Sequence, residues 1–187
     1  MYIARPLGNC CLILLLTVGF FNLMNIARGA EETDFARPNI VLFIADDMAW
    51  DDCEPYGHPH IRTPNLSRLA EGGLTFDNAF LTISSCSPTR CSLITGRYPH
   101  STGAPNLHDS LPADQHLFPE DLKNAGYFTG ACGKWHLGGP AHRGFNKVDG
   151  NLHAWKDFLK ERPQDAPFFF WIATTDPHRN YQPNTIA

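Results

Sequence analysis

The chain has 187 residues, of which 43% are hydrophobic and 18% charged, and its formal net charge is −4 at pH 7. This composition is ordinary for a globular protein, and the length allows one domain with a sizeable core. The sequence has no basic run, so neither its charge nor its composition indicates a nucleic-acid partner.

Residues 1–30 have the layout of a secretory signal peptide. Arg5 precedes an apolar stretch over residues 10–21, and small residues follow within residues 27–30. This order of charged, apolar and small-residue regions is typical of export signals. The apolar stretch is short for a transmembrane helix, so we expect no stable membrane span. We expect cleavage near residues 27–30 and export to the periplasm, the extracellular space or the lysosome, with an uncleaved anchor as the alternative.

Predicted strands alternate with predicted helices along the rest of the chain. Strands are predicted over residues 39–45, 74–80, 127–132 and 167–173. Helices are predicted after Thr63-Pro64, after Cys86, over residues 118–125 and over residues 155–162, with Pro and Gly marking several of their ends. The continuous apolar runs at 39–45 and 167–173 predict strands that are buried on both faces. This alternation predicts an α/β domain with a mostly parallel sheet flanked by helices.

Two adjacent carboxylates, Asp46 and Asp47, follow the first predicted strand directly. In open α/β sheets, ligands bind at the carboxyl ends of the strands. Adjacent carboxylates repel each other unless a cation neutralises them, and hard divalent cations prefer oxygen ligands. A solvated turn or a helix cap is the alternative for an Asp-Asp pair alone. The position at a strand end favours a metal site.

Residues 86–96 read Cys-Ser-Pro-Thr-Arg-Cys-Ser-Leu-Ile-Thr-Gly. Pro88 suits the first turn of a helix, which places Cys86 at or just before the helix N-terminus. Free backbone N–H groups and the helix dipole favour anions there, such as a sulfate group. Arg90 is close enough in sequence to donate hydrogen bonds to a group derived from Cys86. A buried cysteine beside a structural arginine is the alternative.

The same region also contains the Cys-x5-Arg spacing of tyrosine phosphatases, from Cys91 to Arg97. A phosphatase loop wraps an anion with successive backbone N–H groups. Residues 92–94 are predicted to be helical instead, and a helix directs its N–H groups to its own carbonyls. We therefore disfavour this interpretation.

Two further segments carry candidate site residues. If residues 134–136 are extended, Lys134 and His136 point to the same side. A fixed cation and an imidazole on one side can bind a sulfate oxygen and protonate a leaving group. His178 follows the last predicted strand and is placed to reach a substrate. An ordinary surface lysine, an ordinary histidine and a capped loop are the alternatives.

Together these segments resemble the sulfatase family of the alkaline phosphatase-like superfamily. The resemblance rests on Ala45-Asp46-Asp47, Thr63-Pro64-Asn65-Leu66, residues 86–96 and Gly133-Lys134-Trp135-His136. It implies that residues 31–187 are the N-terminal part of a sulfatase catalytic domain, a truncated one because family members are considerably longer. Within the family, Ser84 to Pro88, Leu107-His108 and Asp176 to Arg179 are most similar to the heparan N-sulfatase (sulfamidase) branch.

The resemblance implies a sulfuric ester or sulfamate hydrolase. In this family a formylglycine-generating enzyme oxidises the cysteine that corresponds to Cys86. A calcium ion, or magnesium, would be held by Asp46, Asp47 and formylglycine 86. The hydrated aldehyde would attack sulfur and release the alcohol or amine, and its second hydroxyl would then expel sulfate.

The resemblance also implies roles for the remaining site residues. Arg90 and Lys134 would steady formylglycine 86 and the sulfate, His136 would assist the second step, and His178 would face the leaving group. The expected partner is a sulfated small molecule or glycan. The alternatives are a phosphodiesterase or phosphonate hydrolase of the same superfamily, and a non-catalytic fragment.

Overall fold

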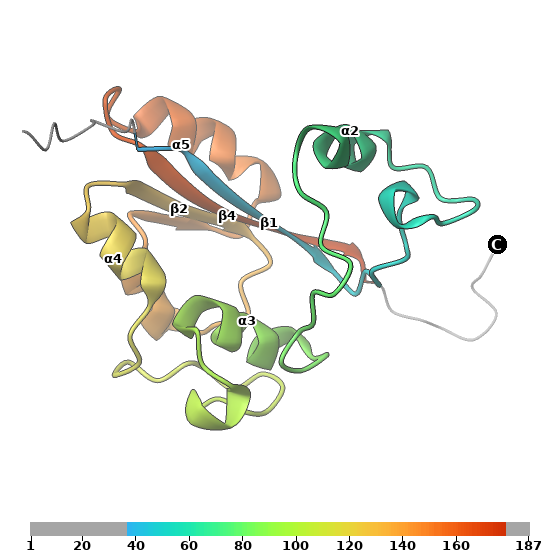
Figure 1. Ribbon diagram of the computed structural model, residues 1–187. Coiled ribbons are helices and arrows are strands. Elements are labelled where there is room, and N and C mark those ends of the chain that lie inside the picture. The colour runs from blue at the N-terminus through green and yellow to red at the C-terminus, as the bar shows by residue number, and fades with distance from the viewer. Residues whose placement is uncertain (1–36, 179–187) are drawn as a thin grey trace, which may run out of the picture. The chain divides into compact units, whose positions relative to one another are not determined.

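The computed structural model describes residues 37–178. Within them, four parallel strands form one sheet in the order β1-β4-β2-β3 (Figure 1). The strands are β1 (Ile40–Asp46), β2 (Phe128–Gly133), β3 (Lys147–Asp149) and β4 (Phe168–Pro177). The predicted α/β fold with a mostly parallel sheet is confirmed.

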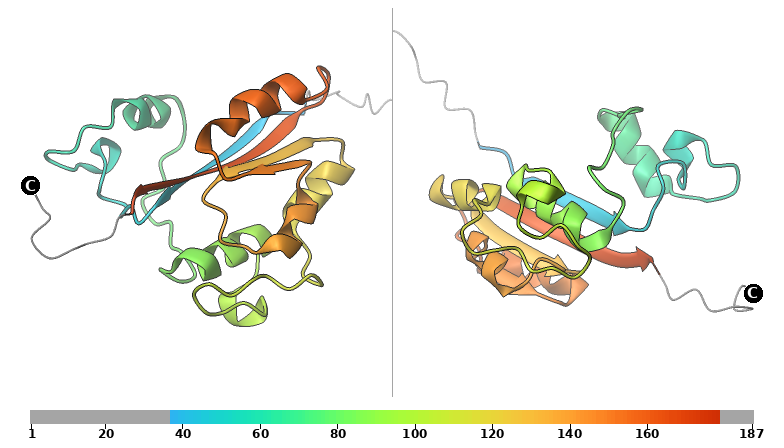
Figure 2. Two further views of the ribbon diagram at one scale, coloured as in Figure 1. Left: turned by 180° about the vertical axis from the view of Figure 1, so that it is seen from behind. Right: turned by 90° about the horizontal axis from the view of Figure 1, so that it is seen from below.

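Helices cover the two faces of the sheet (Figures 1 and 2). On one face lie α3 (Cys86–Thr95) and α4 (Phe118–Asn124), and on the other lies α5 (Trp155–Glu161). Alternate side chains of the central strand β4 pack on opposite faces of the sheet, because successive side chains of a strand point in opposite directions. Phe169 packs in the cluster under α3 and α4, whereas Phe170 packs against α5.

The predicted helices are present, together with several short 3-10 helices. Helix α2 (Pro64–Gly72) begins at its predicted proline. Thr63 occupies the N-cap position of α2, but its hydroxyl accepts a hydrogen bond from the Glu54 N–H at 2.9 Å and makes none to its own helix. The 3-10 helices are Glu54–Tyr56, Pro99–Ser101, Gly139–Gly144 and Leu152–Ala154.

The predicted strand at residues 74–80 is wrong. This segment is a loop with a turn at Asp77-Asn78, and Leu74, Phe76 and Phe80 are exposed. Alternating polarity predicted a strand, but a strand also needs a neighbour for its backbone hydrogen bonds. The described residues offer this segment no such neighbour.

The prediction of burial on both faces is confirmed for β4 and wrong for β1. Strand β4 lies between β1 and β2 and is buried on both faces. Strand β1 lies at the edge of the sheet, and its side chains alternate between packed and exposed. Val41 and Phe43 are 54% and 58% exposed.

The predicted signal peptide at residues 1–30 lies outside the described residues. Within residues 37–178, no helix combines the length and the apolar character needed to cross a bilayer.

Candidate functional site

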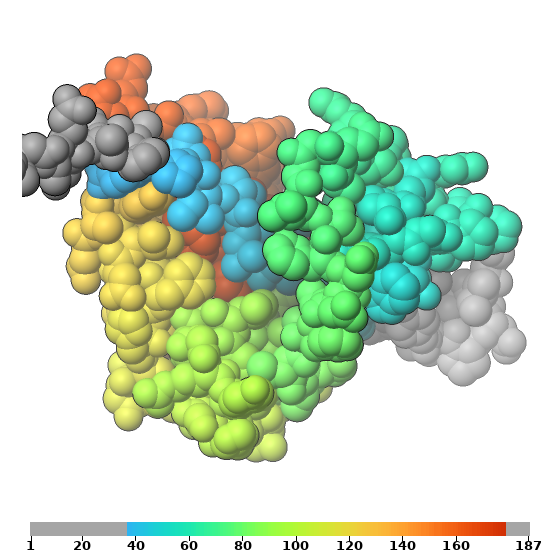
Figure 3. Space-filling view, viewed as in Figure 1, coloured from blue at the N-terminus to red at the C-terminus, as the bar shows by residue number. Residues whose placement is uncertain are grey.

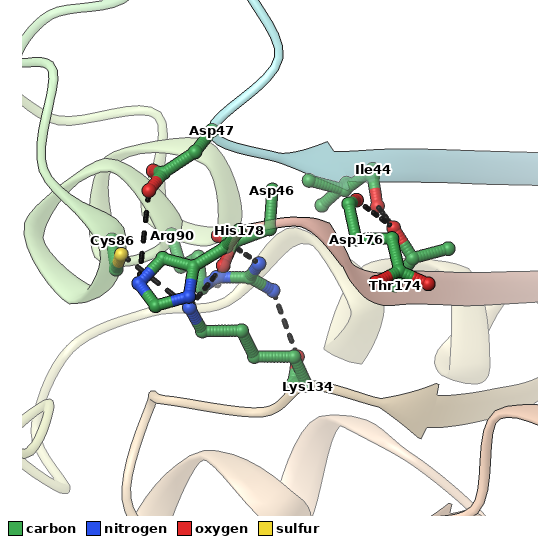
Figure 4. Close-up of polar contacts among 9 residues, drawn as sticks. All are labelled: Ile44, Asp46, Asp47, Cys86, Arg90, Lys134, Thr174, Asp176 and His178. Atoms are coloured by element: carbon green, nitrogen blue, oxygen red, sulfur yellow. Dashed lines mark hydrogen bonds and ion pairs between the residues drawn. The ribbon is translucent and has the colours of Figure 1, made fainter. Parts of the chain in front are cut away.

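Five predicted site residues meet at the carboxyl ends of three strands and the start of α3 (Figure 4). Asp46 ends β1 and Asp47 follows it, Lys134 follows β2, and His178 follows β4. Cys86 is the first residue of α3, as the position of Pro88 predicted. The carboxyl edge of a parallel sheet is the usual place for a ligand site in open α/β folds.

Two cations hold the carboxylate of Asp46. Arg90 donates a hydrogen bond from Nη2 to Asp46 Oδ1 at 3.3 Å, and the Lys134 ammonium donates to Asp46 Oδ2. Asp46 and Arg90 are 5% and 2% exposed, so this ion pair is buried. Burial raises the pKa of Asp46, but Lys134 and Arg90 outweigh burial and leave the pKa below its usual value. Asp46 is therefore a carboxylate at neutral pH.

The Lys134 ammonium also contacts Cys86. Its Nζ lies 3.5 Å from Cys86 Sγ, so Lys134 links the start of α3 to the end of β1. The predicted contact from Arg90 to Cys86 is absent from the described hydrogen bonds, because the guanidinium bonds to Asp46 and to the Lys134 carbonyl at 2.8 Å instead. Arg90 thus fixes Asp46 and the backbone of Lys134, and Lys134 is the cation that contacts Cys86.

Gly133 determines where the chain turns from β2 to Lys134. Gly133 has φ +83°, a conformation that side chains other than that of glycine rarely adopt. A Cβ at Gly133 would clash with the Ala173 carbonyl oxygen of β4. The N–H of Lys134 donates to that same oxygen at 2.8 Å. The chain therefore leaves β2 while still bonded to β4, and this fixes where the Lys134 side chain begins.

Asp47 pairs with His178 at the outer part of the site. Their Oδ2 and Nε2 atoms lie 3.6 Å apart, and their side chains are 48% and 40% exposed. The His178 N–H donates to the Asp46 carbonyl at 3.0 Å, which joins the ends of β1 and β4. Asp47 has φ +56°, so its side chain leaves the direction of the strand. This pair is open to solvent, in contrast to Asp46 and Arg90.

Asp46, Asp47 and Cys86 each bring one ligand atom into a group that spans no more than 4.8 Å. This spacing suits a single metal ion. The two carboxylates fit a hard cation such as Ca²⁺, but a thiol does not, because Ca²⁺ and Mg²⁺ bind oxygen. An oxygen-bearing group at position 86 would complete a set of three oxygen donors.

The extended backbone on which the shared direction of Lys134 and His136 depended is not present at His136. Residues 134–136 follow the end of β2 without strand structure, and His136 has φ +54°. The Nδ1 atom of His136 is buried and has no hydrogen-bond partner among the described residues. Burial lowers the pKa of His136, and the charges of Lys134, His108 and Arg90 lower it further.

The site includes His108, which the sequence did not identify as a site residue. Its ring lies edge-on to the ring of His136, with centroids 5.1 Å apart. Its N–H donates to Ser87 Oγ at 2.7 Å, which ties it to the residue after Cys86. His108 also has a positive φ, of 70°. No sequence pattern indicated that a residue so far along the chain returns to α3.

The Cys-x5-Arg interpretation does not fit the structure. Cys91 is fully buried within α3, and burial raises the pKa of its thiol to about 11. A phosphatase nucleophile is an accessible thiolate. Cys91 is therefore a core residue.

Comparison with known proteins agrees with the geometry of the site. The sequence model of the family described as Sulfatase matches residues 38–154, more than half of the chain. The chain belongs to the sulfatase family. Bovine arylsulfatase A is 42% identical over 140 residues, which are 68% of this chain and 28% of that protein. Human N-acetylgalactosamine-6-sulfatase is 38% identical over 154 residues, 72% of this chain and 30% of that protein.

Solved sulfatase structures share the fold. The structure of BT4656 in complex with its substrate D-glucosamine-2-N,6-O-disulfate is 30% identical, with a TM-score of 0.72. The match covers 79% of this chain and 36% of that one. The phosphonate monoester hydrolase of Agrobacterium radiobacter, 19% identical with a TM-score of 0.65, shares the fold alone. The chain thus spans about a third of the length of the sulfatases that it matches.

Proposed function

We propose that this sulfatase chain contributes the nucleophile half of a site that hydrolyses sulfuric esters or sulfamates. One observation carries the proposal. Cys86 stands at the first residue of α3 with the Lys134 ammonium 3.5 Å from its sulfur and two carboxylates within 4.8 Å. Cations, carboxylates and a helix N-terminus around one cysteine match the needs of an anionic substrate and a metal ion.

We further propose that Cys86 is converted to formylglycine and that Asp46, Asp47 and the converted side chain hold a Ca²⁺ ion, with Mg²⁺ as the alternative. The donor set supports this, because two carboxylates and a thiol suit a hard cation poorly whereas three oxygens suit it well. Formylglycine would supply a hydrated aldehyde with two hydroxyls on one carbon. The cation would supply charge neutralisation beside the sulfate group.

The chain's own residues then have distinct tasks. The Lys134 ammonium binds both a sulfate oxygen of the substrate and the group at position 86. Arg90 keeps Asp46 ionised and oriented from a buried position. The lowered pKa of His136 keeps its imidazole neutral at neutral pH, ready to accept a proton. His178, half exposed beside Asp47, faces the substrate's leaving group.

The proposed substrate is a sulfated small molecule or glycan. The substrate named for BT4656, a glucosamine disulfate, supports a sulfated sugar. The short motifs that resemble the sulfamidase branch, such as Leu107-His108, add sulfamates to the substrates that should be tested. Export through the N-terminal signal peptide is part of this proposal, and it would bring the chain together with a formylglycine-generating enzyme along the secretory route.

Mass spectrometry of the peptide that carries residue 86 tests the first step. The chain is co-expressed with a formylglycine-generating enzyme, and Cys86 is expected to lose its sulfur and gain an aldehyde oxygen. Cys91, buried in the same helix, stays a thiol and serves as the internal control. An unmodified Cys86 under these conditions would falsify the formylglycine mechanism.

Activity assays separate the rival functions. Aryl sulfates, a sulfated glucosamine, an aryl phosphate and a phosphonate ester are offered to the converted chain. Faster turnover of the phosphorus esters would favour the phosphodiesterase or phosphonate hydrolase alternative. Absence of both turnover and calcium binding would favour a non-catalytic fragment.

A further inference from the structure

His108 lies on a loop that is fastened to the start of α3. Its N–H donates to Ser87 Oγ at 2.7 Å, and the same hydroxyl donates to the Asn106 carbonyl at 3.5 Å. Ser87 is 1% exposed, so both contacts are made by a buried side chain. Asp109 closes the turn, because its carboxylate accepts a hydrogen bond from the Asn106 N–H at 2.9 Å. His108 is therefore held beside the residue that follows Cys86.

The loop is also fastened to the segment that carries His136. The Leu111 N–H donates to the Leu137 carbonyl at 3.0 Å. Ser110 lies so close to Gly138 that a Cβ at the glycine would clash with the serine side chain. The segment that follows α3 in the chain forms part of the visible surface in Figure 3. The loop thus joins the start of α3 to the residues after His136.

The backbone of His108 is strained. Its φ is +70°, in the left-handed region that residues other than glycine rarely adopt. The side chain is exposed, so apolar burial does not offset the cost of this conformation. Strained residues persist where the surrounding structure holds them, and they are frequent at functional sites. The hydrogen bond to Ser87 is one contact that holds His108 in this conformation.

The His108 ring restricts how the imidazole of His136 can turn. The Nδ1 atom of His136 is buried and makes no hydrogen bond within residues 37–178. A functional histidine is commonly oriented by a hydrogen bond at one of its ring nitrogens. Here the His108 ring meets the His136 ring edge-on, with the ring planes at 89° and the centroids 5.1 Å apart. This is a favoured arrangement of two aromatic rings, and it takes the place of the hydrogen bond.

We propose that His108 is a positioning residue, which holds the His136 imidazole in the orientation in which that ring accepts a proton. The proposal rests on the proposed function, in which His136 is the proton acceptor. Burial lowers the pKa of His136, and the charges of Lys134, His108 and Arg90 lower it further, whereas Asp46 raises it. His108 therefore also helps to keep the His136 ring neutral.

Carbon-13 and nitrogen-15 NMR of the imidazoles tests the positioning in the 187-residue chain with Cys86 unconverted. In H108A we expect the pKa of His136 to rise by about half a unit, because a neighbouring charge and part of the cover over the ring are lost. We also expect the His136 ring resonances to broaden, since the ring can turn. H108F keeps a ring without the charge and should preserve the sharp resonances.

A matched control is H100A. His100 also contacts an aromatic ring, that of Tyr98 at 5.9 Å between centroids, and it is not part of the site. Its removal should leave both signals of His136 unchanged. If H108A does not fold by circular dichroism, S87A gives the same comparison, because it removes the hydroxyl that holds the His108 backbone.

Kinetics of the converted chain with a sulfate ester supply the second readout. We expect H108A to lower kcat about tenfold with KM little changed, since a displaced proton acceptor slows the chemical step. The fall of kcat on the acid side should begin at higher pH, because His136 must be neutral to accept a proton. H108F should recover most of kcat.

The outcomes separate this role from the proposed function. His136 signals that are the same in H108A and in the original chain overturn the positioning role, whether or not the chain is catalytic. A loss confined to KM would assign His108 to substrate binding and also overturns it. A converted chain that turns over no sulfate ester contradicts the proposed function instead, and the NMR comparison still decides the role of His108.

Discussion

Asp46 and Phe43 lie three residues apart on β1, and their surroundings are opposite. Asp46 is 5% exposed and its carboxylate receives hydrogen bonds from Arg90 and Lys134. Phe43 is 58% exposed, although phenylalanine is among the side chains most often buried in folded proteins. The carboxyl end of β1 is thus closed by polar contacts, while its side and one face are open.

This difference separates what the described residues provide from what they lack. Apolar burial is the main favourable term in folding, and buried charges are costly unless they are paired. In this chain the buried charges of Asp46 and Arg90 are paired, whereas the apolar side chain of Phe43 is exposed. Within residues 37–178, the polar contacts of Asp46 are formed, whereas Val41 and Phe43 of the same strand are exposed. The predictions below test each side of this comparison.

Removing the buried carboxylate should have the largest effect. Asp46→Ala leaves the buried Arg90 guanidinium without its charged partner, and breaking a buried pair in this way costs about 3–5 kcal/mol. Urea unfolding followed by circular dichroism measures the loss. Asp47→Ala is the matched control, because its pair with His178 is exposed and such pairs contribute about 0–1 kcal/mol. Equal losses in the two variants would contradict the buried role of Asp46.

The second-largest effect should come from acid, which removes the stability that Asp46 contributes at the carboxyl end of β1. The pKa of Asp46 in the folded chain lies below the value of 3.8 for the free group. A carboxyl group with a lowered pKa contributes stability fully above its unfolded value and loses that contribution as pH falls through the folded value. Stability attributable to Asp46 is thus retained at neutral pH and lost below about pH 4.

Carbon-13 NMR of the Asp46 carboxyl, followed through an acid titration, measures this directly. Lys134→Ala removes one of the two cations, so the pKa of Asp46 should rise and the acid loss should begin at higher pH. Lys134→Arg keeps the charge and is the control. A carboxyl that titrates identically in all three chains would show that Lys134 does not hold Asp46.

Calcium binding should respond to a single atom at position 86. In the unconverted chain, Cys86→Ser replaces a soft sulfur by a hard oxygen beside Asp46 and Asp47. We expect calcium to bind on the order of tenfold more tightly, about 1.4 kcal/mol, by isothermal titration calorimetry. Cys91→Ser, in the same helix but buried away from the cluster, should leave calcium affinity unchanged. A Cys86→Ser chain with unaltered affinity would argue against a ligand at position 86.

Much of this site could be predicted because parallel strands end at a common edge. Asp46, Lys134 and His178 each follow an apolar strand, so their proximity followed from the strand pattern and the topology. The position of Cys86 followed from Pro88, which marks a helix start. These signals are local in sequence, and the fold converts them into one cluster.

The rest depended on contacts that no local pattern encodes. Arg90 was expected to serve Cys86, but it pairs with Asp46, which lies 44 residues away in sequence. The direction of His136 depends on one backbone angle, φ +54°, and its neighbour His108 arrives through a loop. The apolar run of β1 predicted burial on both faces, because sequence polarity shows what a strand can bury and not whether a neighbour is present.

The smallest effect is expected on the open side of β1, where the same substitution can be compared on two adjacent strands. Phe170→Ala on β4 removes a ring that is 2% exposed, and such truncations cost about 3–5 kcal/mol. Phe43→Ala on β1 removes a ring that is mostly in water, so the loss for the isolated chain should stay within about 1 kcal/mol. Urea unfolding of the two variants gives both values. Equal losses in the two variants would contradict the difference in burial between Phe170 and Phe43.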